Sequence, residues 1–300
     1  MKFERNLKKG MSGEDVRFVK DSLFSLGYYA SKIEQITNST FGSDTLLAVC
    51  KFQRKKGLDP DGIVGPLTWN ALEEALDSKK KKPTNSKVSE RLNKLTNISA
   101  AHRNAIAKDL ANVSELRQEI VLEILSYAYD MDAPGNVQAL YVYGANLYNK
   151  DLTINYGTAA KIEAAARRYP KYFNGGRKEW MLEQIKKNSK LPISDCSGME
   201  VGYMRKHKLV ANTFDTTANN LTTSRAHSTA ISKINLKPGD WVGKSGHIGT
   251  YVGGGLVVEF YGGAQACQLT DLNNRKGFNF VKGKVEAGEG WSRFRRPTYY

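Results

Sequence analysis

The stretch Ser194-Asp195-Cys196-Ser197-Gly198 decides how the second half of this chain folds. Asp195 is a typical helix N-cap, because its carboxylate can accept backbone N–H groups two and three residues further on, and the sequence from Met199 to Lys208 is typical of a helix. Cys196 is then the first helical residue. The positive end of a helix dipole favours a thiolate, so we expect the dipole and a nearby imidazolium to outweigh the Asp195 anion, lower the pKa of Cys196 and make it a nucleophile.

A buried structural cysteine is the alternative for so short a motif, because a free cysteine is among the most buried residue types. The chain of 300 residues holds three cysteines, Cys50, Cys196 and Cys267, and four histidines, with no paired Cys-x-x-Cys. This pattern predicts neither a disulfide framework nor a zinc site, and we expect no cofactor and no metal. A cysteine is therefore free to take part in chemistry.

The net charge of +15 favours a polyanionic partner, which can be nucleic acid, an anionic membrane or an anionic cell wall. No recognised nucleic-acid motif accompanies the charge, and no run of about 18 apolar residues is present, so we expect neither nucleic-acid binding nor membrane insertion. Residues Met1 to Arg5 lack the apolar segment of a secretory signal. We expect the protein to be synthesised in a host cytoplasm and to act after release or delivery.

Residues 1–76 are predicted to form a small all-α domain of three short helices. The second helix ends at Gly57, which suits the left-handed C′ position, and the third begins with Pro66 at its first helical position. Residues 77–87 are basic, lack apolar anchors and contain proline, so they are predicted to be a linker. The remainder, residues 88–300, is predicted to be a second domain.

Several motifs of the first domain agree with one known family. They are Gly10-x-Ser12-Gly13-x-Asp15-Val16, Leu26-Gly27-Tyr28, Phe41-Gly42-x-x-Thr45, Ala48-Val49-x-x-Phe52-Gln53, Gly57-Leu58 and Asp61-Gly62-Ile63-Val64-Gly65-x-x-Thr68-Trp69. Together they resemble the three-helix peptidoglycan-binding domain found on many cell-wall hydrolases. The resemblance implies that residues 1–76 bind bacterial peptidoglycan. The irregular stretch 30–40 departs from the family, where this connection is more compact.

The second domain changes from helices to strands along the chain. Leading helices are expected over 88–115, and more helical sequence lies within 145–191, including 159–168 and 178–188. After the cysteine helix, a strand from His247 to Val252, a three-glycine loop and a return strand from Leu256 to Phe260 are typical of a hairpin.

The hairpin places a second chemical group. With the three glycines as its loop, Val252 faces Leu256 and Glu259 lies opposite Gly249, with His247 as its diagonal neighbour on the same face. A nucleophilic thiol needs an imidazole to take its proton and a third group to hold the imidazole tautomer. The order of cysteine helix, histidine strand and orienting residue is that of papain-like enzymes.

The motifs of the second domain also agree with one known family. They are Tyr141-x-Tyr143-Gly144, Asp195-Cys196-Ser197-Gly198, Thr216-Thr217, Leu236-x-Pro238-Gly239-Asp240 and Gly246-His247-Ile248-Gly249-x-Tyr251-Val252-Gly253. They resemble the NlpC type of papain-like cell-wall cysteine peptidases, and the chain as a whole resembles a bacteriophage endolysin.

The resemblance implies an α+β fold, with helices packed on an antiparallel sheet. It also assigns roles: Cys196 is the nucleophile, His247 the general base and Glu259 the orienting residue. Active-site support and substrate binding are implied for Tyr141, Asp195 and Ser197. Two features depart from the family: Glu259 is a carboxylate where His, Asn or Gln is common, and residues 145–191 form an insertion.

These observations predict a two-domain peptidoglycan hydrolase. The implied reaction is cleavage of an amide bond of the stem peptide, at the D-γ-glutamyl-diamino acid bond, by a Cys-His-Glu mechanism. One alternative is an N-acetylmuramoyl-L-alanine amidase, since related enzymes share the chemistry and attack either bond. The other is a non-catalytic protein that binds the wall polymer. The presence of Cys196, His247 and Glu259 argues against the loss of catalysis.

Overall fold

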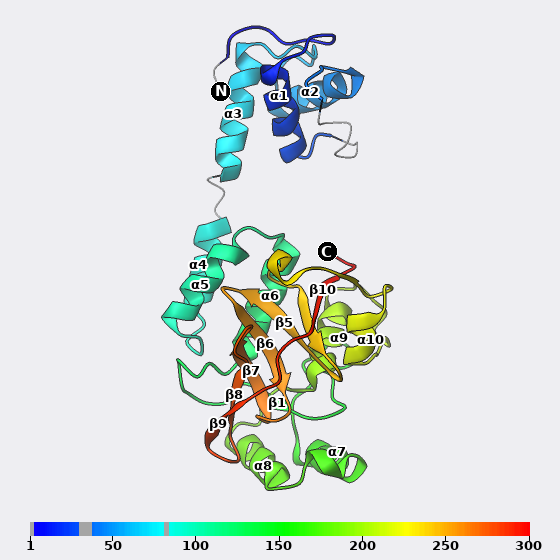
Figure 1. Cartoon of the computed structure of the whole chain (residues 1–300). Helices are drawn as coiled ribbons and strands as arrows, with labels where there is room; N and C mark the ends of the chain where they lie inside the picture. The colour runs from blue at the N-terminus through cyan, green and yellow to red at the C-terminus, as the bar shows by residue number, and fades with distance from the viewer. Residues whose placement is uncertain (1–2, 30–37, 81–83) are drawn as a thin grey trace. The chain divides into compact units, whose positions relative to one another are not determined.

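The computed structural model describes residues 3–29, 38–80 and 84–300. The chain divides into two compact units, Met1–Pro83 and Thr84–Tyr300 (Figure 1). Helices reach into the predicted linker 77–87 from both sides, because α3 extends to Lys80 and α4 begins at Thr84. Lysine is a good helix former and prolongs α3. Part of the predicted linker, residues 81–83, lies outside the described residues, as does most of the irregular stretch 30–40.

The described residues of unit 1 form three helices, α1 (Glu14–Ser25), α2 (Ser43–Lys56) and α3 (Pro66–Lys80). As predicted, α2 ends with Gly57 in the left-handed conformation, at φ 71°. The buried Gln53 holds the connection to α3: its Nε2 donates to Asp61 Oδ1 at 2.8 Å, and its Oε1 accepts the Gly62 N–H at 3.0 Å. The helices enclose one core, formed by Leu7, Val16, Val19, Leu23, Phe41, Ala48, Val49, Phe52, Val64, Trp69 and Leu72.

Unit 2 begins with helices and continues with a sheet. Its helices are α4 (Thr84–Asn93), α5 (Ala100–Leu110), α6 (Glu115–Tyr127), α7 (Ala159–Arg168), α8 (Arg177–Lys187), α9 (Cys196–Lys206) and α10 (Ala218–Thr223), with 3-10 turns η2 (Pro170–Tyr172) and η3 (Lys233–Asn235). Among the described residues, no helix is both long and apolar enough to cross a bilayer.

The sheet of unit 2 has eight strands in the order β2-β1-β7-β6-β5-β4-β10-β3. They are β1 (Leu140–Tyr141), β2 (Ile193–Ser194), β3 (Ser228–Ala230), β4 (Trp241–Lys244), β5 (His247–Gly253), β6 (Leu256–Tyr261), β7 (Ala266–Asp271) and β10 (Arg293–Pro297). Only the short pair β1–β2 is parallel. A separate hairpin is formed by β8 (Lys276–Asn279) and β9 (Lys284–Ala287). The protein is thus a mixed α+β chain with a helical N-terminal region and a sheet-rich C-terminal region.

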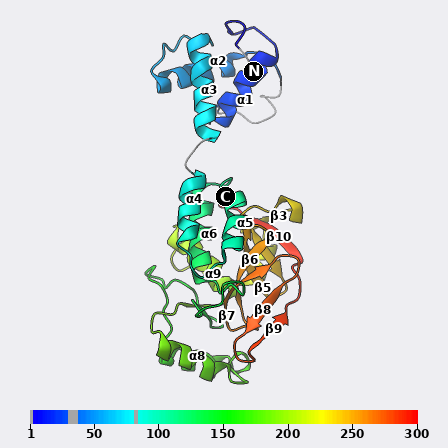
Figure 2. The same ribbon diagram turned by 90° about the vertical axis from the view of Figure 1, so that its left-hand side faces the viewer.

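The two faces of the sheet enter different cores, as the alternation of side chains along a strand requires. Val252 and Val258 pack in the core that includes residues of α5, α6 and α9, and these helices lie against one face of the sheet (Figures 1 and 2). Tyr251 and Val257 pack on the opposite face, next to Trp291. His247 is five residues before Val252, and Glu259 directly follows Val258. Because side chains alternate between the faces along a strand, the strand positions of His247 and Glu259 belong to the second face, with Tyr251 and Val257.

The β5–β6 register agrees with the predicted hairpin away from its loop, with Thr250 opposite Val258. Near the loop the register shifts, so Leu256 faces Gly253 and not Val252 as predicted. The three loop glycines all have positive φ, and the Gly254 N–H donates to Asp109 Oδ2 of α5 at 2.8 Å. This contact with α5 lies outside the hairpin, so hairpin rules could not predict the bulge.

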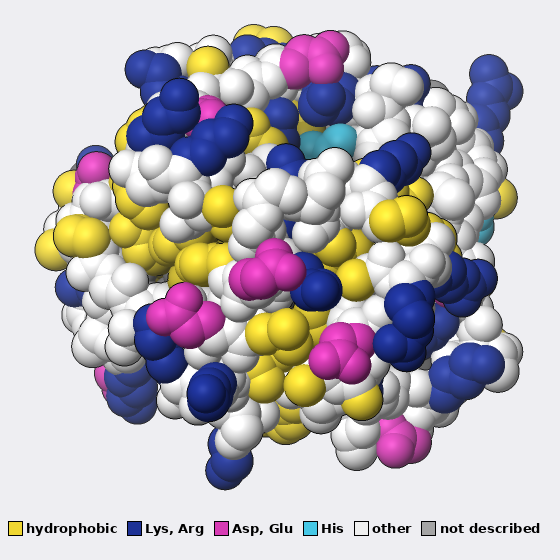
Figure 3. Space-filling model, turned by 90° about the horizontal axis from the view of Figure 1, so that it is seen from below, with side chains coloured by type: hydrophobic (Ala, Val, Ile, Leu, Met, Phe, Trp, Pro, Cys, Tyr) yellow, Lys and Arg dark blue, Asp and Glu magenta, His cyan; other side chains and the backbone are white. Residues whose placement is uncertain are grey.

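The insertion 145–191 contains α7, η2 and α8, and Arg177–Lys187 matches the second predicted helix within a residue at each end. Its apolar side chains pack with those of β1 and β2 in one cluster, formed by Val137, Leu140, Val142, Ile162, Phe173, Met181, Leu191, Ile193 and Ala266. Viewed toward this end of unit 2, Lys and Arg side chains lie around the edge and hydrophobic side chains are exposed between them (Figure 3).

Glu200 links α9 to the sheet beneath the cysteine. Its carboxyl is 1% exposed and accepts from Trp241 Nε1 at 2.8 Å and Thr250 Oγ1. Burial raises the pKa of Glu200 from its ordinary 4.5 to about 7. Because folding raises this pKa, the folded state holds a proton that the unfolded state releases. The stabilisation is complete below pH 4.5 and is lost as the pH rises through 7.

We therefore expect Glu200→Gln to gain stability relative to the unchanged protein as the pH rises from 6 to 9, by about 1.4 kcal/mol, because the pKa of about 7 lies about one pH unit above the start of this range. Urea unfolding followed by tryptophan fluorescence at several pH values measures the difference. Glu163→Gln, at an exposed position of α7, is the matched control and should show no such gain. A constant difference between Glu200→Gln and the unchanged protein across this range would contradict the assignment.

Candidate active site

The start of α9 is built around the Asp195 carboxylate. Asp195 is the N-cap and Cys196 the first helical residue, as the motif predicts. Oδ1 of Asp195 accepts the Gly198 N–H at 2.7 Å and the Ser197 hydroxyl at 3.1 Å, and Oδ2 accepts the Gly144 N–H at 2.9 Å. One carboxylate therefore caps the helix and also ties it to the turn that follows β1.

Gly198 allows this turn to approach the helix. A Cβ at position 198 would lie 2.1 Å from the Ala145 carbonyl oxygen, so any other side chain would push the turn away. The Ala145 carbonyl also accepts the Asp195 N–H at 2.9 Å. The glycine of the motif thus serves close packing between segments about 50 residues apart.

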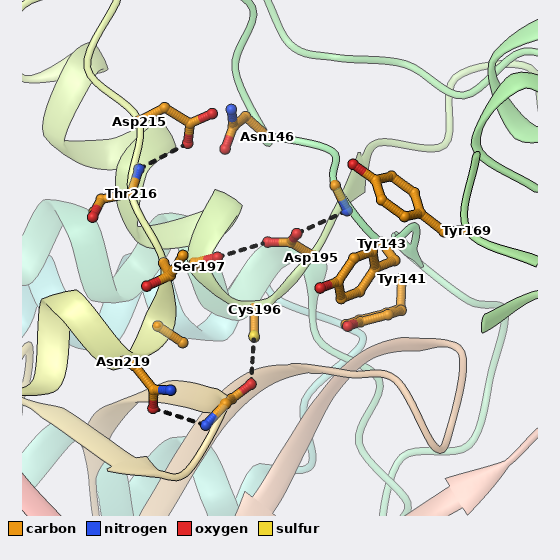
Figure 4. A pocket seen from close by; sticks show the side chains of 14 residues that line it. Tyr141, Tyr143, Asn146, Tyr169, Asp195, Cys196, Ser197, Asp215, Thr216 and Asn219 are labelled. Atoms are coloured by element: carbon orange, nitrogen blue, oxygen red, sulfur yellow. Dashed lines mark hydrogen bonds between the residues drawn. The ribbon is translucent and has the colours of Figure 1, made fainter. Parts of the chain in front are cut away.

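Cys196 lines a hollow of about 560 Å³, and this volume is within the range of about 300–1,000 Å³ that is usual for small-molecule sites. Tyr141, Tyr143 and Tyr169 stand on one side of it, and Asp215, Thr216 and Asn219 on the other (Figure 4). The insertion contributes Tyr169, which meets the Tyr143 ring edge-on at 4.9 Å. Tyr143 is further held by Tyr172, stacked on it at 3.7 Å.

The predicted supporting residues Tyr141, Asp195 and Ser197 all line this hollow with Cys196. Tyr141 is 8% exposed, and its pKa is raised. Burial is the largest cause, and the charges of the neighbouring Cys196 and Asp195 raise the pKa further. Its hydroxyl is therefore protonated at neutral pH and can donate a hydrogen bond. The sequence places these residues far apart, and only the β1–β2 pairing brings Tyr141 next to Ser194 and the start of α9.

The environment of Cys196 differs from the expected thiolate. The side chain is buried, and burial together with the Asp195 charge raises the pKa of Cys196 to about 12. The backbone N–H groups of Ile248 and Ser197 act in the opposite direction but more weakly. The thiol is therefore protonated at neutral pH. The prediction that the pKa of Cys196 is lowered was wrong, because it considered the charge at the helix end but not the desolvation of the buried thiol.

The sulfur lies against the backbone that carries His247. Cys196 Sγ is 4.0 Å from the carbonyl oxygen of Gly246, which also lines the hollow. The backbone N–H of Ile248 also stabilises the ionised sulfur. These two residues flank His247 in the sequence. His247 Nε2 and Glu259 Oε2 are 2.6 Å apart, so Glu259 accepts from Nε2–H. Nδ1 is then the ring nitrogen that does not bind Glu259.

Two further residues at this site escaped the sequence analysis. Arg275 donates to both oxygens of the fully buried Glu259, from Nε at 2.8 Å and Nη2 at 2.6 Å. Trp291 stacks on the His247 ring at 5.5 Å, with an interplanar angle of 12°. Only a general signal pointed to Arg275, because a buried carboxylate requires a partner whose position along the chain is not specified, and no sequence pattern pointed to Trp291.

The hydrogen bonds to Glu259 decide its ionisation. Burial alone raises the pKa of this carboxyl, but hydrogen bonds from Arg275 and then His247 outweigh burial and hold the pKa at about 2. Thr270 Oγ1 adds a donor at 2.8 Å from Oε1. Glu259 is consequently ionised throughout the neutral range.

A group that could hold a metal ion lies away from the hollow, at His102, Asp130 and Asp132. Both ring nitrogens of His102 already contact carboxylates, Nδ1 at 2.7 Å from Asp130 and Nε2 at 3.3 Å from Asp132. The hydrogen bond to Asp130 raises the pKa of His102. The cluster is explained as an ion pair that fixes α5 to the end of α6. The other cysteines are also free, and Cys267, on β7, is buried in the core.

We expect Asp195→Asn to increase the rate at which Cys196 is alkylated by iodoacetamide, by about tenfold or less, because the Asp195 charge raises the thiol pKa. Mass spectrometry of the peptide that contains Cys196, over time at fixed pH, measures the rate. The matched control is Asp215→Asn, which removes another carboxylate from the wall of the same hollow. Slower alkylation in Asp195→Asn than in this control would contradict the electrostatic account.

Comparisons with known proteins concern unit 1. Residues 12–72 match the family described as a putative peptidoglycan binding domain. A stretch of 71 residues is 44% identical to an uncharacterized protein of the bpoA1 3′ region from Kitasatospora aureofaciens, covering 23% of this chain and 57% of that protein. A stretch of 80 residues is 38% identical to the N-acetylmuramoyl-L-alanine amidase CwlL of Bacillus licheniformis, covering 27% of this chain and 21% of the amidase.

One solved structure is also similar in sequence, a peptidoglycan-binding protein from Clostridioides difficile in complex with glutamine hydroxamate. It is 43% identical with a TM-score of 0.21, over 23% of this chain and 40% of that chain. The chain thus covers less than two thirds of the length of each of these relatives. The N-terminal unit carries a peptidoglycan-binding domain, and its relatives include proteins named as cell-wall amidases.

Proposed function

We propose that unit 2 is a papain-like cysteine peptidase that hydrolyses an amide bond in the stem peptide of peptidoglycan. The observation that carries this proposal is the position of Cys196, at the start of α9 and in the wall of a hollow, with its sulfur against the backbone on both sides of His247. Glu259, hydrogen-bonded to His247, supplies the third group. The peptidoglycan-binding domain in unit 1 supports the same substrate.

The reaction begins from a protonated thiol, as the raised pKa of Cys196 requires. His247 takes the thiol proton at Nδ1 while Sγ attacks the amide carbonyl, and Glu259 holds Nε2–H and so the tautomer. The partial positive charge at the N-terminus of α9 stabilises the oxyanion that forms. His247 then gives the proton to the leaving amine, and water, activated by the same imidazole, hydrolyses the thioester.

The walls of the hollow suit a peptide with polar groups on one side. Tyrosine rings from β1, its following turn and the insertion form an aromatic wall, opposite the polar groups of residues 215–219. The insertion supplies Tyr169 and also Tyr172, which stacks on Tyr143. We therefore propose that the insertion determines which stem peptides the site accepts. The D-γ-glutamyl-diamino acid bond is the proposed target, on the resemblance stated above.

Amidase activity is the second candidate function. It is favoured by the two relatives named as N-acetylmuramoyl-L-alanine amidases, although these match over the first part of this chain. The new chemical end on digested peptidoglycan separates the two reactions. A free amino group on the third stem residue identifies the endopeptidase, and one on L-alanine identifies the amidase.

We expect Cys196→Ala to abolish the release of new amino groups from purified peptidoglycan, because it removes the nucleophile. Cys50→Ser, in unit 1, should retain the release and is the matched control. Amino-group labelling followed by mass spectrometry of the fragments gives both the rate and the bond. Continued cleavage by folded Cys196→Ala, verified by circular dichroism, would overturn the proposal.

Binding and cutting should be separable, because the chain divides into two compact units. A chain that begins at Thr84, where α4 starts, should cleave soluble stem peptides at close to the full-length rate but act more slowly on intact walls. The physical reason is that tethering raises the effective concentration of enzyme only at an insoluble substrate. Equal losses on both substrates, with unit 2 still folded, would instead make unit 1 part of the catalytic machinery.

A further inference from the structure

The mechanism above leaves Arg275 without a role, although it is one of the most constrained cations in unit 2. Its side chain is 3% exposed and forms two hydrogen bonds with a fully buried carboxylate. The guanidinium lies between two aromatic rings, 4.3 Å from Tyr261 and 4.8 Å from Trp291. Its Nη1 also donates to the Glu289 carbonyl at 3.1 Å. These contacts fix both its position and its orientation.

The aromatic rings connect Arg275 to the catalytic imidazole. Trp291 contacts the guanidinium and stacks on His247, and Tyr261 lies 6.4 Å from the imidazole. Glu259 Oε2 accepts from both Arg275 Nη2 and His247 Nε2, each at 2.6 Å. A single carboxylate oxygen thus serves the cation and the general base together.

An uncompensated carboxylate at this position would work against the mechanism. A negative charge in contact with a buried imidazole favours the imidazolium, and an imidazolium cannot take a proton from the thiol. Because Cys196 is protonated at neutral pH, the proposed reaction depends on a neutral imidazole. A cation that offsets the Glu259 charge therefore favours the neutral imidazole.

We propose that Arg275 is a positioning residue that neutralises Glu259, so that His247 contacts a hydrogen-bond acceptor within a net-neutral pair. This proposal rests on the proposed function for its catalytic consequence. It explains how a glutamate can occupy the orienting position: the Glu259–Arg275 pair takes the place of one neutral side chain. The low pKa of Glu259 agrees with this pairing.

The charged and titratable groups around His247 must be considered in any pH dependence. Glu259 and Tyr261 of β6 contact its ring, and Arg275 shares the Glu259 carboxylate. Lys244 of β4 is its cross-strand partner, and Cys196 lies against the backbone on both sides of it. Lys244 and Glu289 pair with each other at 2.6 Å, which cancels most of their joint effect. Arg275 is thus the cation hydrogen-bonded to the carboxylate that touches the imidazole.

The proposal predicts an unusual rescue. Glu259→Gln keeps an acceptor for His247 but leaves the buried Arg275 without its carboxylate, and Arg275→Gln leaves the Glu259 charge uncompensated. The double variant Glu259→Gln/Arg275→Gln restores a neutral pair. We expect it to be several-fold more active at pH 7 than either single variant, as measured on a soluble stem peptide.

The electrostatic part has its own measurement in the full-length protein. Nuclear magnetic resonance of ¹⁵N-labelled histidine follows the four imidazoles without any need for catalysis. In Arg275→Gln, we expect the titration midpoint of the His247 ring to move up by about one pH unit, because the imidazolium gains an uncompensated anion. The acidic limb of the kcat profile should move up by a similar amount, with little change in KM.

Two variants separate this role from a merely structural one. Arg296→Gln breaks another arginine pair with a fully buried carboxylate, Asp240 at 2.7 Å, and should leave the His247 titration unchanged. Arg275→Lys keeps the charge, so it should hold the midpoint near that of the unchanged protein even if Arg275→Gln fails to fold. A shifted midpoint in Arg275→Lys equal to that of a folded Arg275→Gln would overturn the charge argument.

The proposal is also overturned if Arg275→Gln leaves the midpoint unchanged, or if the folded double variant is no more active than Glu259→Gln. The titration result stands independently of the proposed function. If Cys196→Ala still cleaves peptidoglycan, the peptidase mechanism fails, while the His247 midpoint still decides whether Arg275 compensates Glu259.

Discussion

The candidate active site depends on one carboxylate, that of Asp195, which accepts three hydrogen bonds from two parts of the chain. Two of them set the first turn of α9 and so the position of Cys196. The third draws in the turn at Gly144, with Tyr143 beside the hollow. Because buried acceptors without partners are costly, this junction forms as a unit or not at all. The same charge opposes ionisation of the thiol, so the cap that positions Cys196 also raises its pKa.

Two buried glutamates near the site show how partners decide ionisation. Glu200, between α9 and the sheet, meets neutral donors from Trp241 and Thr250, and its pKa is raised to about 7. Glu259, on β6, meets a guanidinium and an imidazole, and its pKa is held at about 2. Both carboxyls lose nearly all contact with water. The difference arises from the charge of the donors and not from burial, so one carboxyl serves packing and the other can orient a base.

The two units carry separate structural features. Unit 1 has its own apolar core and a loop fixed by the amide of Gln53, so its peptidoglycan-binding domain needs no residue from unit 2 for its core. Unit 2 buries apolar clusters on both faces of its sheet and carries the hollow beside Cys196. Under the proposed function, this separation allows the affinity for an insoluble wall and the chemistry on its peptides to change independently.

The sequence by itself determined what depends on neighbouring residues. The Asp195 cap, the start of α9 at Cys196, the glycine that ends α2 and the helix 159–168 are all set by short-range backbone geometry, and each agrees with the structure. The hairpin register was also predictable up to its bulge, because strand pairing follows from the loop glycines and the period of two.

Only the tertiary structure decided what depends on distant partners. Burial of the thiol, the hollow beneath the tyrosines, and the contacts of Arg275 and Trp291 with Glu259 and His247 require segments that meet through the sheet. Charge and desolvation act through space, so the ionisation of Cys196 and Glu259 could not be inferred from their neighbours in the chain.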